Sequence, residues 1–115
     1  MKDRMVYIYA ANDCIQAIED YTKGYTQEQF LADNKTQDAV IRNLEVLGQT
    51  IKDFGIEDLK QDYPQIPWSQ IAGMRNIIAH EYLGLDKLII WETVKNHLYP
   101  IKVALEEIIQ LHKKK

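Results

Sequence analysis

One segment of the sequence, residues 75–82, gathers side chains that together could move a proton and stabilise a phosphate. It reads Arg-Asn-Ile-Ile-Ala-His-Glu-Tyr, within an otherwise apolar stretch. An imidazole such as that of His80 can move protons, and a guanidinium such as that of Arg75 is a cation. Metal-free cleavage of RNA needs a base for the ribose 2′-hydroxyl and a positive charge facing the phosphate oxygens. His80 and Arg75 fit these two catalytic roles by residue type.

Helical geometry restricts how these side chains can meet. Five residues along an α-helix turn through about 500°, so Arg75 and His80 should point roughly 140° apart. Tyr82, seven residues after Arg75, returns almost to the same direction. His80 could join them if the helix distorts near its end or if a second subunit completes the site. Spacing alone favours a simpler interpretation, in which Arg75 is an interface residue and His80 a hydrogen-bonded core residue.

Other enzyme signatures lack a required residue. His80-Glu81 begins like the His-Glu-x-x-His zinc motif, but Gly84 occupies the position of the second histidine. Ser69 has no nucleophile-elbow context, and no glycine-rich phosphate loop occurs. The single cysteine, Cys14, excludes an internal disulfide and a cysteine zinc cluster. We therefore expect neither a metal nor a cofactor.

Length and composition indicate one globular domain over residues 1–115. The chain is 46% apolar and 27% charged, with 3 prolines and 5 glycines. A net charge of −3 argues against RNA binding by a broadly basic surface, so any positive potential must be local. No apolar run is long enough for a membrane span, and the amino end has no signal-peptide core, so we expect a cytoplasmic protein without a membrane partner.

The elements that must position the segment are expected to be helices, since apolar residues recur at helical spacing and no segment alternates as a strand would. Thr26 and Gln29 form a capping-box pattern that should open a short helix with Phe30 and Leu31 directed inward. The first helix is expected from Met5 to Tyr21.

Later signals predict the remaining helices of an antiparallel bundle. Helix starts are expected near Asn34, with Gln37, and after Asp86. Gly48 should slightly weaken the helix that contains it. Pro100 should cause a kink or a break near residues 96–99. The expected elements are a long helix from 34 to its end at Gly55, a turn or short helix from 56 to 63, a helix from Trp68 to Leu83, and two helices on either side of Pro100.

The segment resembles the Arg-x4-His-x-Tyr signature of HepT proteins, within the HEPN superfamily. Two residues at one spacing would be a weak signal, but the resemblance covers nearly the whole chain in the same order. The further matching blocks are Phe30 with Asp33 and residues 38–48 (DAVIRNLEVLG), residues 66–68 (IPW) with 71–76 (IAGMRN), and Trp91 with residues 98–100 (LYP).

This resemblance implies an all-α bundle with a four-helix core plus short helices, and a homodimer in which the two segments from Arg75 to His80 face a shared cleft. It implies a metal-independent endoribonuclease toxin acting on cellular RNA, such as tRNA, in a type VII-like toxin–antitoxin pair. It also implies a nucleotidyltransferase antitoxin of the MntA type that attaches AMP to Tyr82. Asn76 matches the polar residue that supports the arginine in the family.

Several residues keep a second interpretation. Asn76 suits a local hydrogen bond to the helix backbone equally well. Arg42 stands in a matching block, which suggests a cleft residue, but ion pairing with Asp38 and Glu45 explains it without function. For the whole protein the alternative is a noncatalytic nucleotide- or substrate-binding partner of a minimal nucleotidyltransferase, which the acidic net charge favours. RNA cleavage would separate the two functions.

Overall fold

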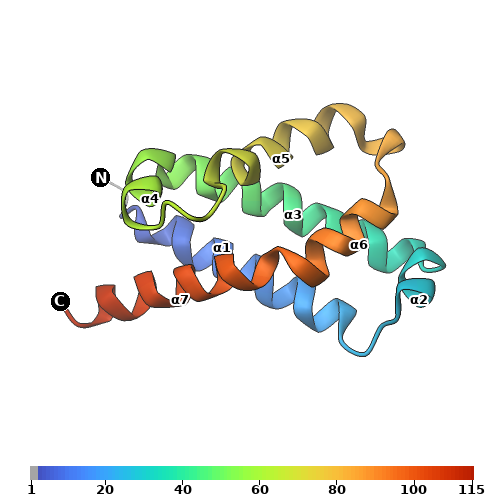
Figure 1. The fold of residues 1–115 in the computed structure, drawn as a ribbon, viewed down its shortest axis with the longest axis horizontal. Coiled ribbons are helices and arrows are strands. Elements are labelled where there is room, and N and C mark those ends of the chain that lie inside the picture. The colour runs from blue at the N-terminus through green and yellow to red at the C-terminus, as the bar shows by residue number, and fades with distance from the viewer. Residues whose placement is uncertain (1–2) are drawn as a thin grey trace.

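The computed structural model describes residues 3–115, and every regular element in this range is a helix (Figure 1). This confirms the predicted all-α helical bundle. None of the helices within the described range has both the length and the apolar character that a membrane span requires. The elements are α1 (Met5–Thr22), α2 (Gln27–Leu31), α3 (Asn34–Phe54), α4 (Ile56–Asp62), α5 (Trp68–Glu81), the 3-10 helix η1 (Tyr82–Gly84), α6 (Lys87–Asn96) and α7 (Leu98–Lys113).

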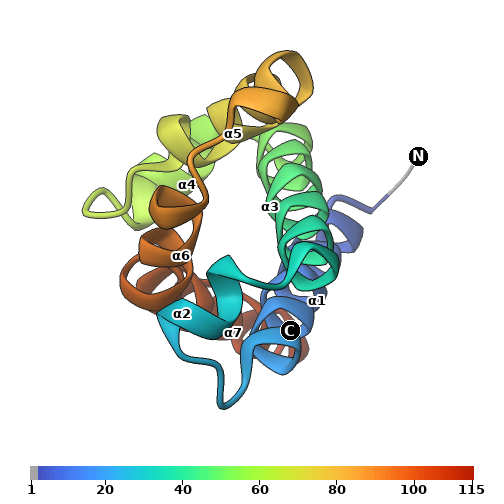
Figure 2. The same ribbon diagram turned by 90° about the vertical axis from the view of Figure 1, so that its right-hand side faces the viewer.

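Contacts between helix ends establish the antiparallel order. Arg4, directly before α1, donates to the Phe54 carbonyl at 2.6 Å and pairs with Asp58 at 2.8 Å, so α1 begins where α3 ends. Near the other end of α1, Glu19 pairs with Lys102 of α7 at 2.8 Å. Helix α1 thus packs against both α3 and α7, while α5 packs on α3 (Figures 1 and 2).

The core is formed by the apolar stripes of these helices and by two buried tryptophans. The Trp68 side chain is fully buried, and its indole donates to the Tyr63 carbonyl at 3.0 Å. Trp91 of α6 packs on Phe30 of α2, with ring centroids 5.1 Å apart. Both tryptophans are therefore core residues, and they anchor the start of α5 and the middle of α6.

The capping box that opens α2 is confirmed. The Gln29 backbone N–H donates to the Thr26 hydroxyl at 3.1 Å, and the Thr26 N–H donates to the Gln29 side chain at 2.9 Å. The expectation that Phe30 and Leu31 both point inward is half wrong. Phe30 is fully buried, but Leu31 is 41% exposed, because a helix of five residues presents only one face to the core.

Helix α3 begins at Asn34 as predicted, but its capping residue is the preceding Asp33 and not Asn34. Asp33 is the N-cap, accepting from the Thr36 N–H at 3.0 Å and from the Tyr25 hydroxyl at 2.7 Å. Asn34 is the first residue of the helix. The Gln37 amide donates to the Phe30 carbonyl at 2.9 Å, so it ties α3 to α2 rather than capping its own helix.

Two further boundaries concern the functional segment and the C-terminal part. The helix predicted from Trp68 to Leu83 ends at Glu81 and continues as η1, so its last turn is tighter than expected. The break predicted near Pro100 is confirmed, since α6 ends at Asn96 and α7 begins at Leu98. Pro100 lies in the first turn of α7, where a missing backbone donor costs little.

Candidate active site at the end of helix α5

The position of α5 depends on a close backbone contact with α3 at Gly48. A Cβ atom at Gly48 would lie 2.8 Å from the Ile71 carbonyl oxygen and 3.0 Å from the Arg75 nitrogen, both of which belong to the α5 backbone. The two helices can approach this far only because residue 48 has no side chain. The backbone nitrogen of Arg75 therefore lies at this contact between the two helices.

Arg75 and Asn76 are joined at the exposed surface of α5. The Arg75 guanidinium donates to Asn76 Oδ1 at 3.2 Å. Asn76 precedes His80 by four residues, so these two side chains lie on one face of the helix. This hydrogen bond directs the guanidinium toward the side of α5 that carries Asn76. Within residues 3–115, no hydrogen bond or ion pair joins Arg75 directly to His80.

His80 lies in the last turn of α5 and is exposed to solvent, as is Arg75. The simpler expectation of a hydrogen-bonded core histidine is therefore wrong. The helix face that α5 buries carries Ile71, Ala72 and Ile78 instead. Because both side chains are exposed, each is open to a substrate, which a core histidine would not be.

Tyr82 follows directly after α5 and is held by α3. Its hydroxyl donates to Asp38 Oδ1 at 2.7 Å. This hydrogen bond raises the pKa of Tyr82 above its ordinary value, and partial burial and the negative charges of Asp38 and Glu45 add to the effect. The side chain is 40% exposed. Its hydroxyl bonds to Asp38, however, and not to Arg75.

Arg42 forms the local ion pair that its spacing suggested. Its Nη1 lies 3.3 Å from Glu45 Oε1, and the arginine side chain is 72% exposed. Asp38, the other expected partner, binds Tyr82 instead. Because residues 38, 42 and 45 follow helical spacing, all three lie on one face of α3. Arg42 thus adds a solvent-accessible cation to the face against which Tyr82 rests.

Asp38 and Gly48 contribute to the site in ways that the sequence did not predict. Asp38 is 44 residues from Tyr82, and only the packing of α5 on α3 brings them together. In the sequence, Gly48 only weakens its helix. Its role in the close packing of α3 and α5 follows from the position of the α5 backbone.

Apolar side chains are exposed beside the site, between α5 and α6. Ile77 is 54% exposed, Ile89 59% and Leu83 98%. Two hollows of about 540 and 340 Å³ lie along this surface and share Met74 and Thr93 as lining residues. We call this surface the α5–α6 face. An apolar surface of this kind is typical of a protein–protein contact.

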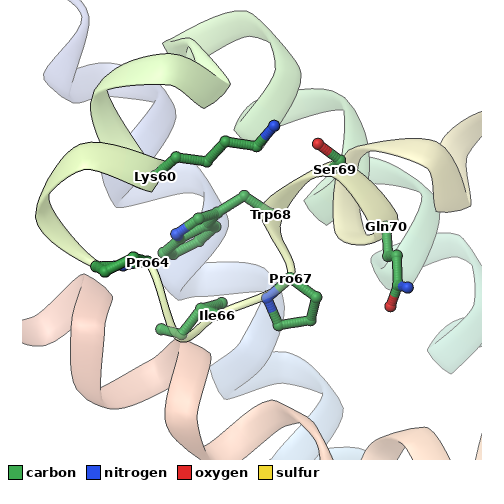
Figure 3. Close-up of a pocket in the computed structure, with 7 residues that line it drawn as sticks. All are labelled: Lys60, Pro64, Ile66, Pro67, Trp68, Ser69 and Gln70. Atoms are coloured by element: carbon green, nitrogen blue, oxygen red, sulfur yellow. The ribbon is translucent and has the colours of Figure 1, made fainter.

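A further hollow lies at the opposite end of α5, in the connector that precedes it (Figure 3). Its lining is largely apolar and contains one charged side chain, that of Lys60. It offers no proton donor or acceptor near His80, and we assign it no part in the chemistry. Its lining residues are Lys60, Pro64, Ile66, Pro67, Trp68, Ser69 and Gln70.

Comparison with known proteins gives a consistent result. The family model described as "Ribonuclease HepT-like" matches residues 11–108. The "Putative RNase MJ0127" of Methanocaldococcus jannaschii is 39% identical over 109 residues, which cover 95% of this chain and 89% of that protein. The "Probable ribonuclease HepT" of Thermococcus cleftensis is 38% identical over 102 residues, covering 89% and 92% respectively. No solved structure gives a significant match.

Proposed function

The chain belongs to the HepT-like ribonuclease family, and from this premise we propose that it is a metal-independent endoribonuclease of the HEPN type that acts as a toxin on cellular RNA, tRNA included. The observation that carries the proposal is the group of exposed side chains of Arg75, Asn76 and His80 on α5, which offers a candidate general base and a cation. Family membership supports the ribonuclease activity, and the geometry supports the assignment of roles.

The proposed reaction needs only groups of the protein and the substrate. The His80 imidazole accepts the proton of a ribose 2′-hydroxyl, and the 2′-oxygen attacks the adjacent phosphorus. The bond from phosphorus to the 5′-oxygen breaks, leaving a 2′,3′-cyclic phosphate, and the 5′-oxygen takes a proton from solvent. Arg75 stabilises the charge that builds on the non-bridging oxygens. Asn76 supports this role by orienting the guanidinium through their 3.2 Å hydrogen bond.

We propose that the active form is a homodimer assembled through the α5–α6 face. Exposure of Ile77, Leu83 and Ile89 supports this assignment. A two-fold axis would place two copies of the site across one cleft. One regular helix does not direct Arg75 and His80 to the same point, so the second copy would supply the missing cation or base. The exposed Arg42 would lie at the margin of the cleft.

We further propose that a nucleotidyltransferase antitoxin of the MntA type inactivates the protein by attaching AMP to the Tyr82 hydroxyl. The partial exposure of Tyr82 supports this. Each AMP adds a phosphodiester charge that would pair with nearby cations and occupy space required by the RNA backbone.

The decisive experiment is incubation of the purified chain, free of any partner, with total RNA in the presence of EDTA. The proposal predicts cleavage with 2′,3′-cyclic phosphate ends, and it predicts none from a His80→Ala variant prepared in the same way. Intact RNA with the wild-type protein would reject the ribonuclease assignment and favour a noncatalytic companion of a nucleotidyltransferase.

A further inference from the structure

We propose that Asp38 is a positioning residue of the active site, which holds the Tyr82 hydroxyl and thereby fixes the turn that ends α5 directly after His80. This rests on the proposed ribonuclease function for its catalytic consequence. Its structural part, the fixing of the turn, does not depend on that function.

The turn at residues 82–84 has few other attachments. The backbone leaves the α-helical conformation at Glu81, where φ is −128° and ψ is 28°. Beyond it Leu83 is 98% exposed, and a Cβ built on Gly84 would meet no atom within 4 Å. Among the described residues, the Tyr82 hydroxyl makes the one side-chain hydrogen bond that ties residues 79–84 to another helix.

The bond from Tyr82 to Asp38 suits a positioning role because it is short and its acceptor is charged. A neutral phenol donating to a carboxylate forms a stronger hydrogen bond than two neutral partners do. The distance of 2.7 Å is that of a well-formed bond. Asp38 lies in the second turn of α3, whereas Gly48 contacts α5 further along the same helix. Helix α3 therefore holds α5 both in its middle and just beyond its end.

The proposed effect is local. Both side chains are substantially exposed, so losing the bond should change the free energy of unfolding little. It should instead release the turn next to His80 and misplace the imidazole in a fraction of the molecules. A displacement of about 1 Å at a catalytic group is enough to lower a rate strongly.

The first test measures hydrogen exchange of the backbone amides of residues 80–85. We compare Asp38→Ala, Tyr82→Phe and the double variant with Asp53→Ala, a matched control. Asp53 is another exposed acid of α3, which accepts a hydrogen bond within its own helix, from Gln49 at 2.9 Å. Exchange should rise several-fold, and equally, in the first three proteins and stay at the wild-type rate in the control. Unchanged exchange in Asp38→Ala would overturn the proposal.

The second test measures RNA cleavage by the same proteins. Asp38→Ala and Tyr82→Phe should each lower kcat by roughly tenfold with little change in KM, and the double variant should be no worse than either. Asp38→Asn, whose amide oxygen can still accept the phenolic proton, should recover much of the rate. If the losses of kcat in the two single variants instead multiplied in the double variant, Asp38 would not act through Tyr82. If the wild-type protein leaves RNA intact, the ribonuclease proposal fails, while hydrogen exchange still decides whether Asp38 holds the turn.

Discussion

At the scale of single residues, the chemistry is assigned to two exposed side chains of α5. Replacing either His80 or Arg75 with alanine should abolish RNA cleavage and growth inhibition, with the rate falling by roughly 10²- to 10⁴-fold for the lost base. Because both positions are exposed, the free energy of unfolding should change by no more than about 0.5 kcal/mol. Cleavage assays with circular dichroism as the folding control measure both effects.

His112 offers a matched control for the histidine substitution. It lies in the last turn of α7, outside the site, and His112→Ala should cleave RNA at the wild-type rate. Undiminished cleavage by a folded His80→Ala protein would contradict the catalytic assignment.

Modification of Tyr82 is also a prediction about one residue. Co-expression with a cognate nucleotidyltransferase should raise the intact mass of the chain by whole AMP units, and Tyr82→Phe should abolish the increase without unfolding the protein. Tyr99, which is 70% exposed, provides the control, because Tyr99→Phe should still be modified. A nucleotide found by mass spectrometry on another residue would contradict the assignment to Tyr82 and leave the ribonuclease assignment intact.

At the scale of elements, the contact between α3 and α5 leads to opposite expectations for two helical glycines. Gly48→Ala should destabilise the protein by about 1–3 kcal/mol, because a Cβ there meets the α5 backbone and the helices must separate. Gly73→Ala, where a Cβ meets nothing within 4 Å, should stabilise it by about 0.5–1 kcal/mol through lower backbone entropy in the unfolded chain.

Urea unfolding of both variants tests this pair. Because Gly48 lies against Arg75, the alanine variant should also lose RNA cleavage beyond its loss of stability. Equal stabilisation by both substitutions would show that the approach of the two helices does not depend on residue 48.

The N-cap of α3 should make stability depend on pH in acid. Hydrogen bonds from Tyr25 and Thr36 lower the pKa of Asp33 from 3.8 to about 2. The stabilisation from the ionised cap is therefore complete above pH 3.8 and is lost as pH falls through about 2. In Asp33→Asn this component of the pH dependence should disappear while the cap remains, since asparagine also caps well.

Thermal unfolding between pH 2 and 5 measures this effect. Asp33→Ala should be less stable than the wild type near neutral pH, and the difference should narrow toward pH 2. A difference that stays constant over this range would mean that the ionised carboxylate does not stabilise the helix.

The elements illustrate which parts of the fold are predictable from sequence. Caps and apolar spacing act within a few residues, so the capping box at Thr26 and the break before Pro100 were correctly placed. The inward direction of Leu31 and the end of α5 were not, because each depends on what packs against the helix. The pairing of Asp38 with Tyr82 spans 44 residues and leaves no local signal. The catalytic candidates could be proposed from residue type and family resemblance, but their geometry required the packed helices.

At the scale of the whole molecule, the structure measures 45 × 30 × 27 Å, and residues 3–115 leave the α5–α6 face exposed. Ile77→Glu should convert the proposed dimer into a monomer, because it places a charge in the apolar contact. Leu111→Glu near the end of α7 is the matched control, since both side chains are 54% exposed. It should leave the dimer intact.

Sedimentation at micromolar concentration distinguishes these outcomes, with circular dichroism confirming that both variants fold. The monomer should also lose RNA cleavage if the second copy completes the site. A wild-type monomer would contradict the homodimer, and a dimer in both variants would assign the contact to another face.

The proposed modification of Tyr82 would also prevent its hydrogen bond to Asp38 from forming again. An esterified tyrosine has no phenolic proton to donate, and it carries an anion that Asp38 and Glu45 repel. The ring therefore cannot return to its resting place on α3 once the nucleotide is attached. Because the nucleotide is bound covalently, inactivation would persist after the antitoxin has departed. Reversal would require an enzyme that cleaves the ester.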